Sequence, residues 1–162
     1  TPAVSLGCNF LRSFSHVTLD LAAGEAYFST GGRYEPDPMK LAAAVPLLGD
    51  PALLTVNALL DGHGPYPVHL ATGVDTELWL PRSLVAEEEA APTTRAAKRG
   101  FRPLTPRKLD LSGFELQGIE AVVLESANPG EDPPGPVLGN RFLRRYRVTL
   151  DFEAGKLYLE QP

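Results

Sequence analysis

The sequence predicts an all-β protein, and three observations support this fold class. Apolar residues occur in short runs rich in β-branched side chains, such as residues 17–21, 121–124 and 148–152. Turn-forming Ala-Gly pairs at 23–24 and 154–155 follow two of these runs. Sixteen prolines and fifteen glycines among 162 residues suit many turns and few long helices.

The elements are expected in a definite order along the chain. A helical turn at 9–14 precedes a β-hairpin that turns at 23–24, and a strand at 53–59 leads into a glycine-rich turn at 61–65. A second apolar strand runs into Ala71-Thr72-Gly73 and is followed by "TELWLP". The remaining expected elements are a hairpin over 109–125, an apolar strand at 137–139, a helical turn at 141–146 and a final hairpin turning at 154–155.

Charge and composition exclude several classes of function. The formal net charge of -5 and the sequence pI of about 5.2 disfavour a nucleic-acid surface, which needs a basic stripe. The most apolar long stretch, residues 41–60, is interrupted by Pro46, Gly49, Asp50 and Pro51, so no membrane span is expected. Cys8 is the only cysteine, which excludes an internal disulfide and a cysteine-based zinc site.

No cofactor or metal is expected. No pair among the three histidines has metal-ligand spacing. The sequence also contains no serine in a nucleophile-elbow pattern and no glycine-rich loop ending in Lys-Ser or Lys-Thr.

An internal repeat is the most informative feature of the sequence. "LGCNFLRSFSHVTLDLAAGEAYFST" from Leu6 aligns with "LGNRFLRRYRVTLDFEAGKLYLEQP" from Leu138, with about a dozen identities and one inserted residue near His16. The long sequence between the copies has no earlier counterpart. We therefore assign residues 1–30 to the C-terminal tail of a preceding repeat, residues 31–49 to a connector and residues 50–162 to one complete domain.

The order of these elements resembles the retropepsin-like aspartic proteases. The carriers of the resemblance are the apolar strand that ends in x-Thr-Gly, the apolar-apolar-Gly element Val137-Leu138-Gly139, and the closing "LGNRFLRRYRVTLDFEAGKLYL". The resemblance implies a retropepsin-like acid protease β-barrel with one short helix near the C-terminus. By position, Thr72 and Gly73 match the family's Asp-Thr-Gly loop, and the residues that match the packing around it are Leu70, Val137, Leu138 and Gly139.

In that family two Asp-Thr-Gly loops, one from each half of a dimer, meet and share a proton. One carboxylate acts as general base on a water molecule and the other protonates the peptide carbonyl. The threonine hydroxyl braces the loops across the axis, and the glycine allows a tight conformation and a close approach of the partner. The implied partners are a peptide or protein substrate and a second copy in a homodimer.

The catalytic position does not match, because Ala71 stands where the family has aspartate. A methyl group can neither accept a proton from water nor donate one to a carbonyl. The resemblance therefore implies an aspartic endopeptidase domain that is inactive as written, so whether the chain is an enzyme stays open. Asp75 is expected to point away from the axis, and Asp20 and Asp151 are expected to support their hairpins.

Three interpretations of Ala71 remain. In the first, Ala71 is an engineered replacement of a natural aspartate that stops self-cleavage. In the second, the protein is a natural pseudoprotease that acts as a peptide-binding or dimerisation module. In the third, a preceding unit supplies an Asp-Thr-Gly loop, and this unit completes the two-unit site with only one carboxylate. A β-barrel binding domain without protease ancestry is a fourth interpretation. The compartment is unknown from the sequence, and a location outside the cytoplasm, periplasmic or secreted, is implied by the resemblance alone.

Overall fold

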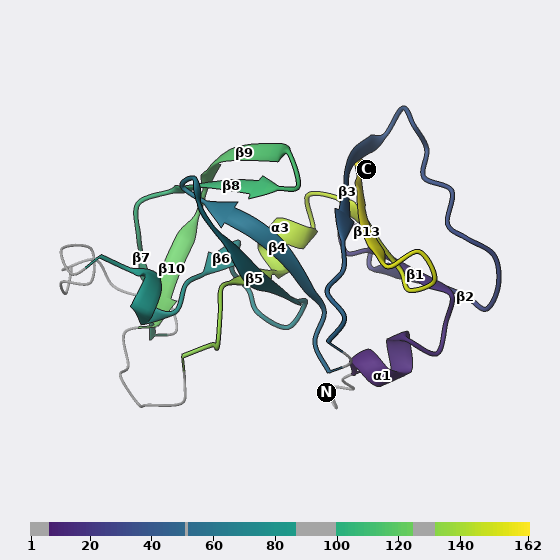
Figure 1. Cartoon of the computed structure of the whole chain (residues 1–162), viewed down its shortest axis with the longest axis horizontal. Coiled ribbons are helices and arrows are strands. Elements are labelled where there is room, and N and C mark those ends of the chain that lie inside the picture. The colour runs from purple at the N-terminus through teal and green to yellow at the C-terminus, as the bar shows by residue number, and fades with distance from the viewer. Residues whose placement is uncertain (1–6, 51, 87–99, 125–131) are drawn as a thin grey trace.

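The computed structural model describes residues 7–50, 52–86, 100–124 and 132–162, and it confirms the all-β fold class. Short strands form two sheets, and the helices are single turns: α1 (Cys8–Leu11), the 3-10 turn η1 (Arg82–Leu84) and α3 (Asn140–Leu143). The short helix near the C-terminus is thus present as α3. Figure 1 shows α3 between the two sheets and α1 at the margin of the molecule.

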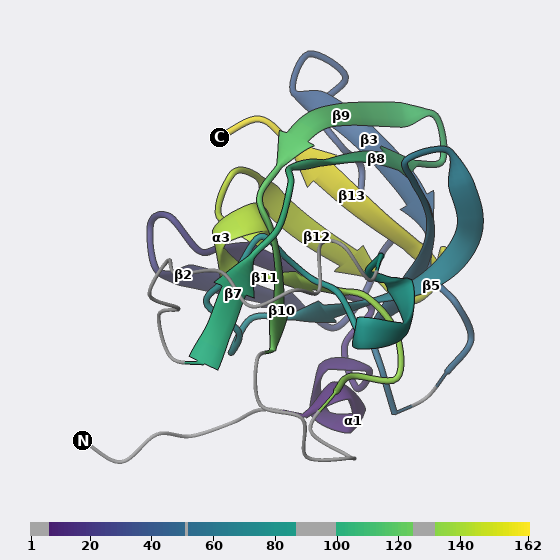
Figure 2. The same ribbon diagram turned by 90° about the vertical axis from the view of Figure 1, so that its left-hand side faces the viewer.

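The larger sheet contains eight strands that curl around the core (Figure 2). Their spatial order is β7, β10, β6, β11, β5, β4, β8, β9. In chain order their bounds are β4 (Thr55–Leu60), β5 (His63–Ala71), β6 (Leu78–Trp79), β7 (Phe101–Pro103), β8 (Arg107–Leu111), β9 (Phe114–Ile119), β10 (Ala121–Leu124) and β11 (Val137–Gly139).

The smaller sheet joins both copies of the sequence repeat. Its five strands lie in the order β2, β1, β12, β13, β3. Their bounds are β1 (His16–Asp20), β2 (Glu25–Ser29), β3 (Leu41–Pro46), β12 (Arg147–Asp151) and β13 (Lys156–Glu160). The hairpins β1–β2 and β12–β13 are the ones that the repeat predicts, and β1 pairs antiparallel with β12 of the same chain.

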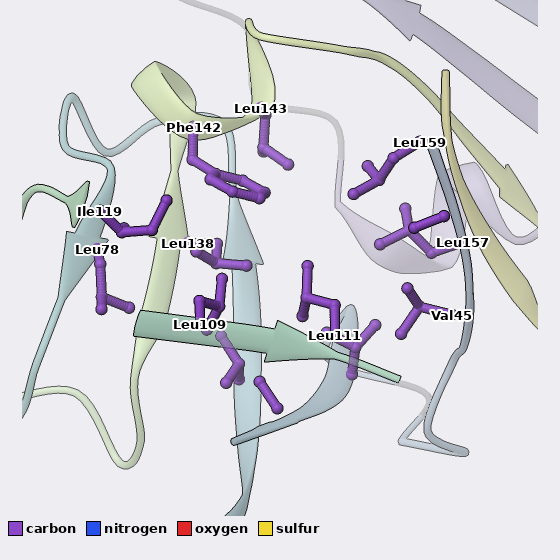
Figure 3. Packing of buried hydrophobic residues seen from close by; sticks show 14 of the residues in the cluster. Val45, Leu78, Leu109, Leu111, Ile119, Leu138, Phe142, Leu143, Leu157 and Leu159 are labelled. Atoms are coloured by element: carbon purple, nitrogen blue, oxygen red, sulfur yellow. The ribbon is translucent and has the colours of Figure 1, made fainter. Parts of the chain in front are cut away.

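The hydrophobic core lies between the two sheets. Figure 3 shows Val45, Leu157 and Leu159 of the smaller sheet facing Leu109 and Leu111 of the larger one. Phe142 of α3 is 1% exposed and packs in the same core. Burial of these side chains is the main stabilising contribution to the barrel.

Part of the predicted connector is a strand. Residues 41–46, expected within the connector 31–49, form β3 and pair with β13. All six residues are apolar, so the sequence carries no alternation, and the pairing with β13 sets which of them are inside: Ala43 and Val45 are buried while Ala44 and Pro46 are exposed. The first six residues of the predicted tail 1–30 lie outside the described residues.

No helix among the described residues is long and apolar enough to cross a membrane.

Candidate functional site

The segment Ala71-Thr72-Gly73 lies where β5 ends and the chain turns back toward β6. Strand β11, which follows much later in the sequence, inserts between these two strands. It pairs parallel with β5, placing Gly139 beside Ala71, and antiparallel with β6. The predicted packing residues Leu70, Leu138 and Gly139 are therefore brought to the loop at residues 71–76, which we call the site loop.

Backbone hydrogen bonds hold the site loop against the start of α3. The amide of Asn140 donates to the carbonyl oxygen of Val74 at 2.7 Å, and the amide of Arg141 donates to that of Thr76 at 3.1 Å. The amide of Gly139 donates to the Glu77 carbonyl at 3.0 Å. These bonds satisfy the amides that a helix start leaves without partners, and they fix the loop conformation at the same time.

Asn140 adds a side-chain hydrogen bond to the tip of the loop. Its Nδ2 donates to the carbonyl oxygen of Thr72 at 2.9 Å. This residue was not among those predicted from the sequence. The signal available was its position, directly after the apolar-apolar-Gly element, where a side-chain donor can reach the neighbouring loop.

Position 139 must be glycine because backbone oxygens of the site loop leave no space for a side chain there. A Cβ atom at this position would lie 2.4 Å from the carbonyl oxygen of Thr76 and 2.5 Å from that of Val74. Real Cβ atoms do not approach backbone oxygens so closely, so any side chain would push the site loop away from β11. The glycine of the apolar-apolar-Gly element thus permits the contact between β11 and the loop.

Gly73 has a different environment. A Cβ atom there would meet nothing within 4 Å, and its φ lies outside the left-handed region. Thr72 and Gly73 are exposed, while Ala71 is half-buried. Within this chain, neither space nor backbone conformation requires glycine at position 73.

A buried carboxylate next to the site loop was also missed by sequence reasoning. Glu77 is 5% exposed, forms an ion pair with Arg145, and accepts a hydrogen bond from the amide of Glu120 at 2.8 Å. Glu77, directly before β6, thus connects Arg145, which follows α3, with Glu120, which precedes β10. Because both its oxygens are used in this way, Glu77 is a structural acid rather than a substitute for a carboxylate at position 71.

The other acids considered from the sequence lie elsewhere. Asp75 is exposed on the site loop. Asp20 Oδ1 accepts a hydrogen bond from the Ala23 amide at 2.9 Å, and Asp151 Oδ1 accepts one from the Ala154 amide at 2.8 Å. These matching contacts confirm that the two repeated aspartates support their hairpin turns.

A cleft of about 550 Å³ lies away from the site loop. It is lined by residues of the β4–β5 turn and of η1, including His63, Tyr66 and Leu84. Tyr66 precedes Ala71 by five positions on β5, a span of roughly 16 Å along a strand. The described residues contain no group of three or more histidine, cysteine, aspartate or glutamate side chains that could hold a metal ion.

No protein-family model matches the chain, and no curated protein is significantly similar to it. Among solved structures, the chain is similar to the crystal structure of a retropepsin-like aspartic protease from Rickettsia conorii. The two share 18% sequence identity with a TM-score of 0.47, over 74% of this chain and 89% of the other.

Proposed function

We propose that this chain is one unit of an aspartic-peptidase-like protein. Its site loop is one of the two loops that form the site, and it lacks the carboxylate because Ala71 stands at that position. The observation that carries the proposal is the site loop. It connects two strands of one sheet and presents Thr72 and Gly73 at the surface. Four hydrogen bonds from β11 and α3 hold this loop and the adjoining Glu77 in place.

The exposed tip of the loop suits a second loop rather than this chain alone. The Thr72 hydroxyl has no hydrogen-bond partner among the described residues, although its carbonyl oxygen is bound by Asn140. Gly73 is not required by its own surroundings, as shown above. A partner loop that approaches closely would use both features, because it needs a nearby hydroxyl and the absence of a side chain.

The chemistry explains why the chain is not expected to hydrolyse peptides by itself. Two carboxyl groups are needed: one takes a proton from water while the water oxygen bonds to the peptide carbonyl carbon, and the other gives its proton to the carbonyl oxygen. Ala71 supplies neither group. Two copies of this chain would bring two methyl groups together, which leaves the water without a base.

A module that binds a peptide or another protein without catalysis is the second candidate. The observation that favours it is a cluster of exposed aromatic residues on α1 and β2, where Phe10 and Phe28 are 45% and 41% exposed. Such residues are typical of surfaces that bind another protein.

A peptidase assay on a mixed peptide library, from acid to neutral pH, tests the first candidate. The chain is compared with Ala71→Asp and with Ala71→Asn, a control of similar size without an acid. Strand β1 pairs with the edge of β12, so a second copy of the chain cannot pair with that edge. Each substitution at position 71 is therefore also combined with Val17→Asp. This change places a charge at a fully buried position of β1 and releases its hairpin.

We expect cleavage only from Ala71→Asp with the hairpin released, because only then can two carboxylates meet. Fluorescence of Trp79, the sole tryptophan, shows whether the barrel remains folded. Cleavage by the unsubstituted chain or by the Ala71→Asn control would show that hydrolysis does not need a carboxylate at position 71. A folded, dimeric Ala71→Asp, Val17→Asp protein that does not cleave would exclude a half-site.

A further inference from the structure

The two copies of the repeat are related by a local two-fold arrangement. Thr18 of β1 lies opposite Thr149 of β12, and their hydroxyl groups form a buried hydrogen bond of 2.9 Å. On one side of this pair His16 faces Asp151, and on the other Asp20 faces Arg147. The repeat aligns His16 with Arg147 and Asp20 with Asp151. Each residue of β1 therefore pairs with the same repeat position in β12 as its equivalent in β12 does in β1, which is the register of a two-fold axis through the threonine pair.

The smaller sheet is nevertheless incomplete on one side. Beyond β12, strand β13 pairs with β3, but beyond β1, strand β2 ends the sheet. Equivalent residues differ accordingly in exposure: Tyr158 and Leu159 of β13 are 8% and 0% exposed, whereas Tyr27 and Phe28 of β2 are 49% and 41% exposed. Within the part of the chain that the structure describes, the N-terminal hairpin therefore lacks the strand and the core that cover its C-terminal equivalent.

The aromatic residues next to this edge form the beginning of a second core. Phe14 lies 5.4 Å from Phe10 and 4.9 Å from Phe28, measured between ring centroids. The repeat aligns Phe10, Phe14 and Phe28 with three residues that are buried in the main core, namely Phe142, Tyr146 and Leu159. We call the three phenylalanines and the free edge of β2 the N-terminal aromatic face.

We propose that the N-terminal aromatic face is the docking surface for a second β-barrel unit, which precedes Gly7 in the same polypeptide. That unit would fill the place that residues 41–139 occupy around α3, β12 and β13, and would add a strand to β2 as β3 is added to β13. Its length would be on the order of 100 residues, a normal size for a small domain.

A second copy of this chain does not fit the face. In each copy the corresponding place in the barrel is filled by its own α3 and hairpin, with Phe142 and Leu143 at 1% and 2% exposure. Only a barrel without its own closing helix and hairpin can take up Phe10 and Phe28. A unit directly before the first copy of the repeat would be such a barrel, because α1 and the β1–β2 hairpin would be its closing helix and hairpin, as α3 and β12–β13 are for the barrel described here.

This inference rests on the repeat and its register and is independent of residue 71, so structural measurements test it separately from the peptidase assay. The natural polypeptide, expressed from its own start codon, is compared with residues 1–162 by hydrogen exchange. We expect the β2 amides that do not bond to β1 to exchange at least about tenfold more slowly in the longer protein. The amides of β13, which already has a partner on each side, serve as the control and should not change.

Substitution of the face gives a second readout. Phe10→Asp with Phe28→Asp should return the exchange of β2 in the longer protein to its rate in residues 1–162. Equal β2 exchange in the two proteins would overturn the proposal, as would a natural polypeptide without an upstream barrel. Dimerisation of residues 1–162 that slows β2 exchange and is lost with Phe28→Asp would also overturn it, since the occupant would then be a second copy.

Discussion

Two backbone carbonyl oxygens, those of Val74 and Thr76, occupy the space that a side chain at Gly139 would need. We predict that Gly139→Ala lowers the free energy of unfolding by roughly 1–3 kcal/mol, the usual cost of overpacking a close contact. The reason is that the site loop must move away from β11. Urea unfolding measures the cost, and the amide chemical shifts of residues 72–76 report the displaced loop.

Gly73→Ala is the matched control for this substitution. Its Cβ atom enters open space, so we expect a change within about 0.5 kcal/mol, as for an ordinary surface position. Equal costs at the two glycines would contradict the assignment of Gly139 as the contact between β11 and the loop.

Tyr34 makes the free energy of unfolding depend on pH in the alkaline range. Partial burial and a hydrogen bond to Glu160 raise the pKa of its phenol above the ordinary value of 10.0. Above this pH the unfolded chain loses the phenolic proton while the folded chain keeps it. The contribution of Tyr34 to stability is therefore complete below pH 10 and decreases as the pH rises toward the folded pKa.

We accordingly predict that the free energy of unfolding decreases above about pH 10 and that Tyr34→Phe makes this decrease smaller. Urea unfolding at neutral pH and above pH 10 measures the difference. Tyr146, whose pKa is raised mainly by burial, contributes in the same direction, so part of the decrease should remain in the variant. An unchanged pH dependence would contradict the prediction.

Single elements of the two repeat copies have the same sequence pattern but different surroundings. Phe142 in α3 is 1% exposed, and its equivalent Phe10 in α1 is 45% exposed. We predict that Phe142→Ala lowers the free energy of unfolding of the 162-residue chain by about 3–5 kcal/mol, while Phe10→Ala costs less than about 1 kcal/mol. Thermal and urea unfolding of both variants measure the contrast.

Similar costs for both substitutions would show that α1 is already packed in a core of its own. That result would remove the reason for a second unit, because the N-terminal aromatic face would then be satisfied within the chain.

The repeat made several elements predictable. Both hairpins and both helical turns could be placed because one copy supports the interpretation of the other, and the apolar-apolar-Gly element indicated the strand beside the site loop. Residues 41–46 were harder to assign, because only pairing with β13 shows that "LAAAVP" is a strand. Asn140 and Glu77 were missed because their roles depend on loop and strand contacts between segments more than 40 residues apart.

The whole molecule differs in one respect from the homodimer that the resemblance implies. The edge of β12 is paired with β1 of the same chain and is therefore not open to a strand of a second copy. We predict that the 162-residue chain sediments as a monomer at concentrations at which Val17→Asp associates, because the substitution frees this edge. A chain that dimerises more strongly than the variant would contradict this prediction.

The pairing of Thr18 with Thr149 also has a consequence for the order of folding. Each hairpin closes over a short turn, at residues 21–24 or 152–155, and can form early. The contact between the hairpins joins residues 131 positions apart, so its loop-closure entropy is lost only when most of the barrel is in place. The N-terminal hairpin should therefore dock last during folding and detach first during unfolding.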